Sequence, residues 1–342
     1  MKKTAIITGI HGQDGAYLAQ LLLEKNYRVI GADRRRADSI PWRLKDLGIH
    51  DDVEYVYMDL LEYSNMFETI KRIKPTEIYN LAAQSFVGAS FKQPLLTSEI
   101  NAMGTLKLLD IIKTLDPNIK FYQASTSEMF GKIHEPIQSE TTLFHPRSPY
   151  AVSKLFAHWM VKNYRESYNI FATSGILFNH ESLYRGIDFV TKKITDHIAR
   201  HSLLPGKELL LGNLSACRDW GYAKEYVNGM YLMMQHHTPS DFVLATGKTL
   251  SIKEFVVKAY KYVDIDIEWE GEGVNERGYD VATNKLLVRV SEEFYRPAEV
   301  ELLKGDYSKA KAELGWEPKT SIDELIKIMI DFDIKMNKTI IT

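Results

Sequence analysis

The stretch TAIITGIHGQDG, residues 4–15, decides the fold. Its apolar start has the length of a buried strand, and an amphipathic helical pattern begins at Tyr17. Glycines between a strand and a helix let the backbone turn tightly and approach a pyrophosphate, whose charge suits the helix N-terminus. The pattern predicts a dinucleotide site at Gly9, Gly12 and Gly15, with a plain strand-to-helix turn as the alternative.

The first 180 residues alternate short apolar runs with segments whose apolar residues recur every three to four positions. This alternation is typical of βαβ units, so we predict an α/β fold with a Rossmann-type, doubly wound parallel sheet. The expected strands are Thr4–Thr8, Arg28–Ala32, Glu54–Met58, Glu77–Leu81, Lys120–Ala124 and Ala172–Leu177. The expected helices are Tyr17–Lys25, Met66–Ile73, Ala102–Leu115 and Ala151–Tyr168.

The pattern becomes irregular after about residue 180. It contains a strand-like run at Phe242–Ala245 and two helices that open with capping boxes. These boxes are Ser251-x-x-Glu254 and Ser321-x-x-Glu324. We expect residues 1–180 to form a dinucleotide-binding domain with the catalytic residues. Residues 181–342 should form a smaller mixed α/β lobe that mainly binds substrate, with segments crossing between the two.

Composition excludes several classes of protein. The chain has 342 residues, of which 45% are hydrophobic, and its net charge of −2 leaves no basic tract for nucleic acid. A single cysteine, Cys217, argues against disulfides and structural zinc, so no metal is expected. The first apolar run is too short for a signal peptide or a membrane span. We expect a cytoplasmic protein without membrane contact.

The end of the second expected strand carries conflicting signals about the cofactor. Asp33 stands where an acidic residue commonly binds the ribose of NAD. Arg34, Arg35 and Arg36 follow directly, and guanidinium groups suit the 2′-phosphate of NADP. The arginines could also be a solvated charge run. Asp59, after the third strand, is a candidate for the adenine amino group or a simple turn residue.

Tyr150 and Lys154 lie one helical turn apart after the fifth expected strand. An ammonium group beside the phenol is expected to lower the pKa of Tyr150 and to hold the nicotinamide ribose. Tyr150 would then serve as a base for an alcohol proton. The spacing alone is common, so the position after the strand is what supports this role.

Thr126, Ser127 and Glu128 come just after the same strand, at the carboxyl edge where parallel sheets bind ligands. Thr126 can hydrogen-bond a hydroxyl group that is being oxidised. Glu128 could take the acidified proton next to the resulting ketone and start a β-elimination. The alternative is structural, because Ser125-x-x-Glu128 also reads as a capping box.

Together these stretches resemble the extended short-chain dehydrogenase/reductases and, within them, the GDP-mannose 4,6-dehydratase family. The likeness runs from about Thr4 to Asp331 and rests on several motifs in register. These motifs are FYQASTSE at 121–128, PRSPYAVSK at 146–154, ILFNHES at 176–182, RDWGYAK at 218–224 and YRPAEV at 295–300.

The resemblance implies roles for particular residues. The catalytic set is Thr126, Glu128, Tyr150 and Lys154. The expected cofactor contacts are Gly9, Gly12, Gln13, Asp14, Gly15, Asp33, Arg34, Arg35, Asp59, Leu60, Leu81, Ala82, Ala83, Tyr150 and Lys154. The expected contacts to the GDP-sugar are Ser85, Asn179, Val190, Lys193, Gly212, Arg218, Arg296 and Glu299.

The resemblance also implies a reaction without net oxidation or reduction, because the hydride taken from the sugar is returned to it. The sugar is oxidised at C4, loses water across C5 and C6, and is reduced at C6 to a 4-keto-6-deoxy sugar. The cofactor can stay tightly bound; we favour NADP, with NAD kept possible by Asp33. The alternatives are a nucleotide-sugar 4-epimerase, which needs no Glu128, and a non-enzymatic dinucleotide-binding regulator.

Three stretches depart from the family pattern. Residues 37–49 lack the usual serine-rich loop that is associated with the 2′-phosphate and with subunit contacts. Leu183 and Tyr184 stand in place of Pro-Arg, so one substrate arginine is missing, and residues 187–188 stand in place of Glu-Thr. Gly88 and Ala89 are smaller than the family's residues and could leave room for a GDP-manno-heptose in place of GDP-mannose.

The helix that carries Tyr150 predicts self-association. Phe156, Trp159, Met160 and Tyr164 add more apolar surface than one sheet face would cover. In relatives this helix pairs with its copy, so we expect a homodimer or a homotetramer.

Overall fold

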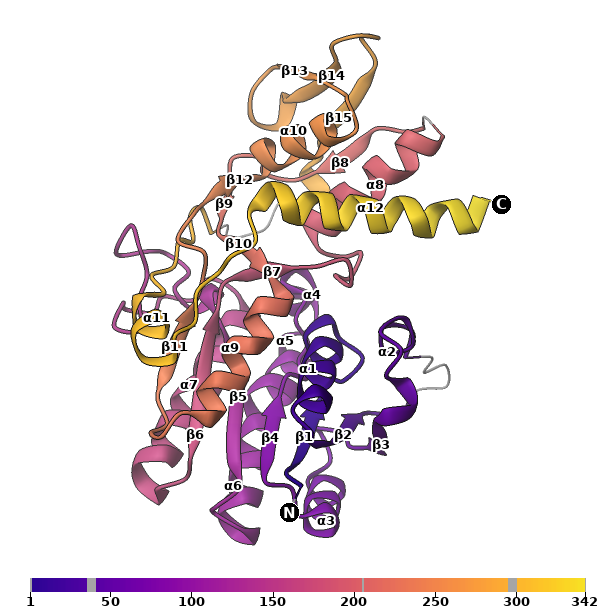
Figure 1. Ribbon diagram of the computed structural model, residues 1–342. Helices are drawn as coiled ribbons and strands as arrows, with labels where there is room; N and C mark the ends of the chain where they lie inside the picture. Colours follow the sequence, from indigo (N-terminus) through magenta and orange to yellow (C-terminus); the bar gives the residue numbers. More distant parts are fainter. Residues whose placement is uncertain (1, 36–40, 205, 295–299, 342) are drawn as a thin grey trace.

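Seven parallel strands form the central sheet of the computed structural model, which describes residues 2–35, 41–204, 206–294 and 300–341 (Figure 1). Their order is β3-β2-β1-β4-β5-β6-β11, which reverses direction between β1 and β4. This is the doubly wound arrangement, and ligands bind at its reversal point. The strands are β1 (Thr4–Thr8), β2 (Arg28–Asp33), β3 (Glu54–Tyr57), β4 (Glu77–Asn80), β5 (Lys120–Thr126), β6 (Ala172–Leu177) and β11 (Asp241–Leu244).

The sheet confirms the expected fold class and six expected strands, with two differences. Strand β5 continues to Thr126, which pairs with Leu177, so Ser125 and Thr126 lie inside the strand rather than after it. The run at Phe242–Ala245 belongs to the large sheet, where β11 lies parallel to β6. The chain therefore returns to the first sheet long after residue 180.

Helices cover both faces of the sheet because successive strand residues point to opposite sides. Ile7 of β1 lies in the core between the sheet and the helices α1 and α9. Ile6 lies in the core on the other side, between the sheet and the helices α3, α6 and α7 (Figure 1). These helices are α1 (Gln13–Glu24), α9 (Ala223–Gln235), α3 (Tyr63–Ile73), α6 (Gly104–Leu115) and α7 (Pro149–Tyr168). The two faces thus have separate apolar cores.

A smaller lobe is built on a four-stranded mixed sheet, in the order β13-β14-β15-β8. Its strands are β8 (Leu209–Leu211), β13 (Ile267–Glu270), β14 (Arg277–Asp280) and β15 (Leu286–Val290). Its helices are α8 (Val190–Leu203), α10 (Ile252–Tyr262) and α12 (Ile322–Ile341). Both capping boxes are present: Glu254 N–H donates to Ser251 Oγ at 3.1 Å, and Glu324 N–H donates to Ser321 Oγ at 3.2 Å.

Short elements connect the lobes. Strand β7 pairs with β10 and β9 pairs with β12, each as a two-stranded ladder. These strands are β7 (Asn179–Glu181), β9 (Cys217–Arg218), β10 (Trp220–Tyr222) and β12 (Leu250–Ser251). The short helices are α2 (Trp42–Asp46), α4 (Val87–Lys92), α5 (Pro94–Ser98) and α11 (Ser308–Leu314), and a π-helix (Glu99–Met103) precedes α6.

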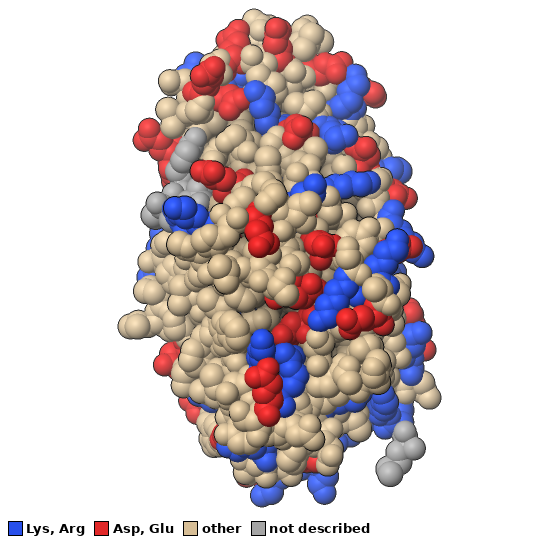
Figure 2. Space-filling model, turned by 90° about the vertical axis from the view of Figure 1, so that its left-hand side faces the viewer, with Lys and Arg blue, Asp and Glu red and all other residues tan. Residues whose placement is uncertain are grey.

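One side of α7 remains exposed. Val152, Phe156 and Trp159 form a stripe along the helix and are 54%, 40% and 50% exposed. Tyr164 does not belong to this stripe, contrary to expectation, because it is buried in the core under α6. Figure 2 shows the molecule from the left-hand side of Figure 1, with a broad uncharged area at mid-height on the left and intermixed acidic and basic side chains on the right. None of the described helices is long and apolar enough to cross a membrane.

Candidate active site

The glycine loop lies directly on the edge of the sheet. Gly9 has φ +70°, and a Cβ added there would lie 2.9 Å from the backbone nitrogen of Ala82. A Cβ on Gly15 would lie 2.5 Å from the carbonyl oxygen of Gly9. Helix α1 begins after Gly12 without a side-chain cap. Its first N–H groups therefore suit a pyrophosphate, and the residues present fit a dinucleotide.

The side chains of Gln13 and Asp14 are directed toward β7. Gln13 Nε2 donates to the carbonyl of His180 at 2.8 Å, and Ser182 Oγ donates to Gln13 Oε1 at 2.9 Å. Asp14 Oδ2 lies 2.8 Å from His180 Nε2. Burial lowers the pKa of His180, but the Asp14 carboxylate outweighs it and leaves that pKa above its usual value. The two side chains thus join the glycine loop to the second lobe.

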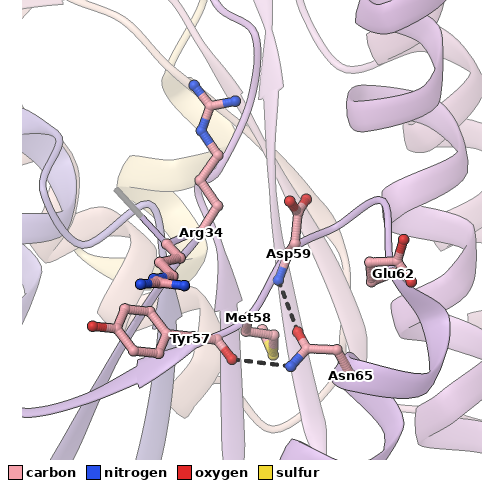
Figure 3. Close-up of a pocket in the computed structure, with 7 residues that line it drawn as sticks. Arg34, Tyr57, Met58, Asp59, Glu62 and Asn65 are labelled. Atoms are coloured by element: carbon pink, nitrogen blue, oxygen red, sulfur yellow. Dashed lines mark hydrogen bonds between the residues drawn. The ribbon is translucent and has the colours of Figure 1, made fainter. Parts of the chain in front are cut away.

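A pocket of about 490 Å³ lies beyond the ends of β2 and β3 (Figure 3). In Figure 3, Arg34 and Asp59 extend in the same direction from the two strand ends. Asp59 Oδ1 also accepts the N–H of Leu61 at 3.0 Å, so its turn role is present as well. The pocket is lined by Arg34, Arg35, Tyr57, Met58, Asp59, Glu62 and Asn65. Arg36 lies outside the described residues.

The other expected cofactor residues follow β3 and β4. Thr8 Oγ1 accepts the N–H groups of Leu81 and Ala82, both at 3.0 Å, which ties this segment to the glycine loop. Leu60 is buried in the core, and Ser85 is exposed beyond the same segment. The structure thus brings the residues after β1, β3 and β4 to one edge.

Glu128 follows β5 in a short 3₁₀ helix, Ser127–Met129. The cap of this helix is Thr126, whose Oγ1 accepts the N–H of Glu128 at 3.2 Å. Ser125 faces elsewhere, with its Oγ 3.2 Å from His158 Nδ1. The capping-box alternative for Ser125 and Glu128 is therefore wrong, because Ser125 is still part of the strand.

Tyr150 and Lys154 lie on the first turns of α7, beside the end of β5. Ser148 caps the helix by accepting the N–H of Ala151 at 3.1 Å, and Pro149 occupies its first position. Tyr150 is 9% exposed and Lys154 is 3% exposed. Lys154 Nζ donates to the carbonyl of Ala124 at 3.0 Å and lies 6.0 Å from the centre of the Tyr150 ring.

The charge balance at Tyr150 differs from the expected one. Burial raises the pKa of Tyr150 to about 12, with the Thr126 hydroxyl and Arg185 opposing and the Glu128 carboxylate adding to the rise. Burial also lowers the pKa of Lys154 to about 8. The expected lowering of the Tyr150 pKa by Lys154 is not found, because burial dominates and the ammonium group bonds the Ala124 carbonyl.

Arg185 is a site residue that the sequence analysis missed. Its Nε lies 2.9 Å from Glu181 Oε2, and its guanidinium group stacks 3.5 Å from the centre of the Phe189 ring. It is one of the charges that act on Tyr150. The signal was available, because Arg185 directly follows the position where an arginine is missing.

The missing arginine is replaced by a packing residue. Tyr184 is buried, and its hydroxyl donates to Asp46 Oδ2 of α2 at 2.5 Å. Trp42 packs edge-on against the Tyr184 ring, and Arg43 Nε donates to the Tyr184 carbonyl at 2.9 Å. The divergent segment therefore folds back onto its own chain from residue 41 onward; residues 37–40 lie outside the described part.

Three of the expected substrate residues contact Phe294 or Val300, while Arg296 and Glu299 lie outside the described residues. The Lys193 ammonium group lies 3.5 Å from the centre of the Phe294 ring, and burial lowers the pKa of Lys193. A Cβ on Gly212 would lie 2.6 Å from the Phe294 carbonyl oxygen. The buried Arg218 donates to the Val300 carbonyl at 2.7 Å.

Asn179 and Val190 each begin an element of secondary structure. Asn179 begins β7 opposite Trp220, and Val190 is the first residue of α8. The same helix carries Lys193, which connects these residues to the Phe294 side of the site.

The space beside Gly88 is less open than expected. A Cβ on Gly88 would lie 3.1 Å from the ring of Phe86, which in turn packs edge-on against Phe189. Phe86 therefore fills part of the volume that the smaller residue leaves. Its ring is 41% exposed, so it can still turn away.

Comparisons with known proteins identify the family. The family model described as GDP-mannose 4,6 dehydratase matches residues 6–329. A Cricetulus griseus protein of that name is 48% identical and covers 99% of this chain and 93% of its own length. The GDP-mannose 4,6-dehydratase of Sinorhizobium fredii is 47% identical over 97% of each chain.

Solved structures share the fold at lower identity. The dTDP-glucose 4,6-dehydratase DesIV from Streptomyces venezuelae superimposes with a TM-score of 0.82 at 19% identity, covering 98% of both chains. A UDP-glucose 4-epimerase from Thermotoga maritima has a TM-score of 0.79 at 22% identity, covering 98% and 99% of the chains. Dehydratases and epimerases thus share this fold, whereas the family match covers nearly the whole sequence. The chain belongs to the GDP-mannose 4,6-dehydratase family.

Proposed function

We propose that the protein is a hydro-lyase that converts GDP-mannose to the GDP-4-keto-6-deoxy sugar. The observation that carries this proposal is the position of Glu128, beside Thr126 at the end of β5 and close enough to raise the pKa of Tyr150. An alcohol dehydrogenation needs Thr126 and Tyr150 but not this carboxylate. An elimination of water next to a ketone does need a base, and Glu128 supplies it.

The proposed cofactor is a tightly bound nicotinamide dinucleotide, with NADP favoured over NAD. The glycine loop and the uncapped start of α1 support the pyrophosphate, and Lys154 is buried where it can hold a ribose. Arg34 and Arg35 on the β2 side of the pocket suit a 2′-phosphate. A solved fold relative, RMD from Pseudomonas aeruginosa, is complexed with NADPH.

Each residue near Glu128 is assigned to one step of the proposed reaction. Thr126 holds the C4 hydroxyl and Tyr150 accepts its proton. A nicotinamide held by the glycine loop and Lys154 would supply reversible hydride transfer and, in its oxidised form, a positive charge that favours the Tyr150 phenolate. Glu128 takes the C5 proton and passes it to the C6 hydroxyl, which leaves as water. The proton that Tyr150 took from the C4 hydroxyl goes to C5 when C6 is reduced.

We propose that residues 1–180 hold the cofactor and that residues 181–342 mainly hold the GDP-sugar. Arg218 and Arg296 are assigned to the diphosphate, Glu299 to the nucleotide ribose, and Asn179, Val190, Lys193, Gly212 and Ser85 to the remaining contacts. The protein acts as a homodimer or homotetramer in the cytoplasm. The exposed stripe on α7 supports the self-association.

The second candidate substrate is GDP-manno-heptose. Gly88 and Ala89 favour it, but the Phe86 ring near Gly88 reduces the available space. One added hydroxymethyl group changes the preference by on the order of 1–3 kcal/mol, so kcat/KM for the two GDP-sugars decides between them. A tenfold preference for GDP-mannose would exclude the heptose.

The test of the elimination step is Glu128→Gln. Because the amide cannot accept the C5 proton, we expect dehydration to fall by roughly 10²–10⁴-fold while the bound dinucleotide is retained. The product is followed by mass spectrometry as the loss of one water from the GDP-sugar. Glu135→Gln, an exposed glutamate whose carboxylate accepts from Thr142 Oγ1, is the matched control.

Undiminished dehydration by the Glu128→Gln variant would overturn the assigned mechanism. If the wild-type protein instead returns an isomer of unchanged mass, it is a 4-epimerase. Tight dinucleotide binding without turnover of any GDP-sugar would favour a regulator.

A further inference from the structure

The imidazole of His11, in the middle of the glycine loop, contacts the carboxylate of Asp33 at the end of β2. His11 Nδ1 lies 2.9 Å from Asp33 Oδ2. The two side chains are 17% and 16% exposed, so the pair is largely shielded from solvent. The contact joins the loop that suits the pyrophosphate to the residue that commonly reads the adenosine ribose.

The second oxygen of Asp33 is also bonded within the chain. Asp33 Oδ1 accepts the N–H of Arg34 at 2.8 Å. In an NAD site, the acidic residue at this place accepts the ribose hydroxyls and repels a 2′-phosphate. Here the carboxylate faces the glycine loop and its own backbone, which reduces both effects.

The backbone of His11 is held by Arg43. Arg43 Nη1 donates to the His11 carbonyl at 2.9 Å, and Arg43 Nε donates to the Tyr184 carbonyl. The Arg43 guanidinium group also stacks 4.4 Å from the centre of the Trp42 ring. The backbone that carries His11 is therefore tied to α2 and to Tyr184, which fixes the position from which the ring reaches Asp33.

Positive charge lies on the pocket side of the pair. Arg34 and Arg35 line the pocket beyond β2, and Figure 3 shows Arg34 reaching out from the strand end. A phosphate bound by these arginines would lie near Asp33, so an uncompensated carboxylate would oppose it. The arginines therefore favour the 2′-phosphate only if the Asp33 charge is compensated.

We propose that His11 is a specificity-determining residue that allows a chain with Asp33 to accept NADP. The imidazole Nδ1–H donates to the carboxylate, keeps it turned toward the glycine loop and offsets part of its negative charge. This inference rests on the proposed dinucleotide site, and it assigns His11 a role in selecting the cofactor rather than in the reaction.

The test compares the dinucleotide held by the full-length protein. Wild type, His11→Ala, Asp33→Asn and the double variant are equilibrated with equal amounts of NADP and NAD. The bound dinucleotide is then released by denaturation and identified by chromatography. His50→Ala is the matched control, because His50 lies in the same lobe and its Nδ1 contacts the Tyr55 hydroxyl instead of a carboxylate.

We expect His11→Ala to lower the ratio of bound NADP to NAD on the order of tenfold, the scale of one charge in a partly screened site. The double variant should restore the ratio, because the carboxylate that His11 compensates is gone. His50→Ala should leave it unchanged. His11→Asn, which can still donate from its side-chain amide, should fall between wild type and His11→Ala.

Two outcomes separate this inference from the cofactor assignment. An equal ratio in wild type and His11→Ala overturns the role of His11, whichever dinucleotide the wild type prefers. If the wild type holds mainly NAD and His11→Ala shifts the ratio further toward NAD, the preference for NADP is wrong but the role of His11 stands. If His11→Ala does not fold, His11→Asn replaces it in the comparison, with a smaller expected fall in the ratio.

Discussion

Lys154 is a residue of the site whose buried ammonium group lowers the stability of the fold. Its side chain is 3% exposed, and its ammonium group has one described hydrogen bond, to the Ala124 carbonyl. Burial lowers its pKa from 10.5 to about 8. A buried charge with so little compensation destabilises the fold, so its presence is explained by the chemistry at Tyr150 rather than by packing.

Replacing Lys154 with Met should therefore stabilise the cofactor-free protein while abolishing activity. The pKa difference between 10.5 and about 8 corresponds to about 3 kcal/mol at pH 7. Part of this gain is lost because the Ala124 carbonyl then lacks its donor. Urea unfolding of both proteins measures the difference.

The pH dependence of this difference has a definite sign. Below about pH 8 the amine is charged in both the folded and the unfolded state, so the full cost is present. Between about pH 8 and 10.5 the folded protein releases its proton first, so the stability of the wild type rises relative to the Met variant. A Met variant that is less stable than wild type at pH 7 would contradict this account.

The residues of the site could be predicted from the sequence only where they belong to a recognisable motif. Thr126, Glu128, Tyr150 and Lys154 stand in such motifs, and the structure places them at one edge of the sheet. The pairing of His11 with Asp33 could not be predicted, because it depends on the register of β1 and β2 at their carboxyl ends. The pKa of Tyr150 could not be predicted either, because it depends on burial.

At the scale of the elements, β11 is the strand whose place could not be read from the sequence. The first six strands alternate with helices, which predicts a parallel sheet. A four-residue strand after α9 carries no pattern that selects one sheet over another. Its place is set by contacts that are distant in sequence, namely the ladder to β6 and the ion pair between Arg165 of α7 and Asp241.

Asp241→Asn tests how firmly this ion pair holds β11. Arg165 donates two hydrogen bonds to the carboxylate, at 3.0 and 2.8 Å, and the side chains are 13% and 14% exposed. Burial raises the pKa of Asp241, but Arg165 outweighs it and the pKa is lowered. The variant leaves a buried guanidinium group without its partner, which costs about 3–5 kcal/mol at pH 7.

The cost should disappear as the pH falls through the pKa of Asp241, because the wild-type carboxylate is then also neutral. Denaturant unfolding between pH 7 and pH 2 should show a constant difference down to about pH 3.8, the ordinary pKa of an aspartate, and convergence of the two proteins below it. Asp110→Asn is the control, since that carboxylate pairs with Lys113 on the exposed side of α6 and should not change stability. Equal stability of wild type and Asp241→Asn at pH 7 would show that β11 is held by the ladder alone.

For the whole molecule, the exposed apolar stripe on α7 predicts that the protein self-associates through this helix. Val152, Phe156 and Trp159 are exposed on a helix whose opposite side is buried in the core. A charge in the stripe cannot be buried between two copies without a partner. We expect Trp159→Glu to convert the wild-type oligomer to a monomer, as measured by light scattering at micromolar concentration.

Val281→Glu is the control for this experiment, because Val281 is similarly exposed, at 58%, but lies in the smaller lobe. The control should keep the wild-type mass. A wild-type protein that is already monomeric would contradict the self-association itself.

The late return of β11 to the sheet has a consequence for synthesis on the ribosome. Strand β6 stays at the open edge of the sheet until Asp241–Leu244 emerges, about 60 residues later. At roughly 5–20 residues per second, this interval lasts several seconds. During that time the nascent chain presents an unpaired strand that can join other chains. Truncation shortly before residue 241 should therefore yield an aggregating fragment, although every residue of the catalytic set is already present.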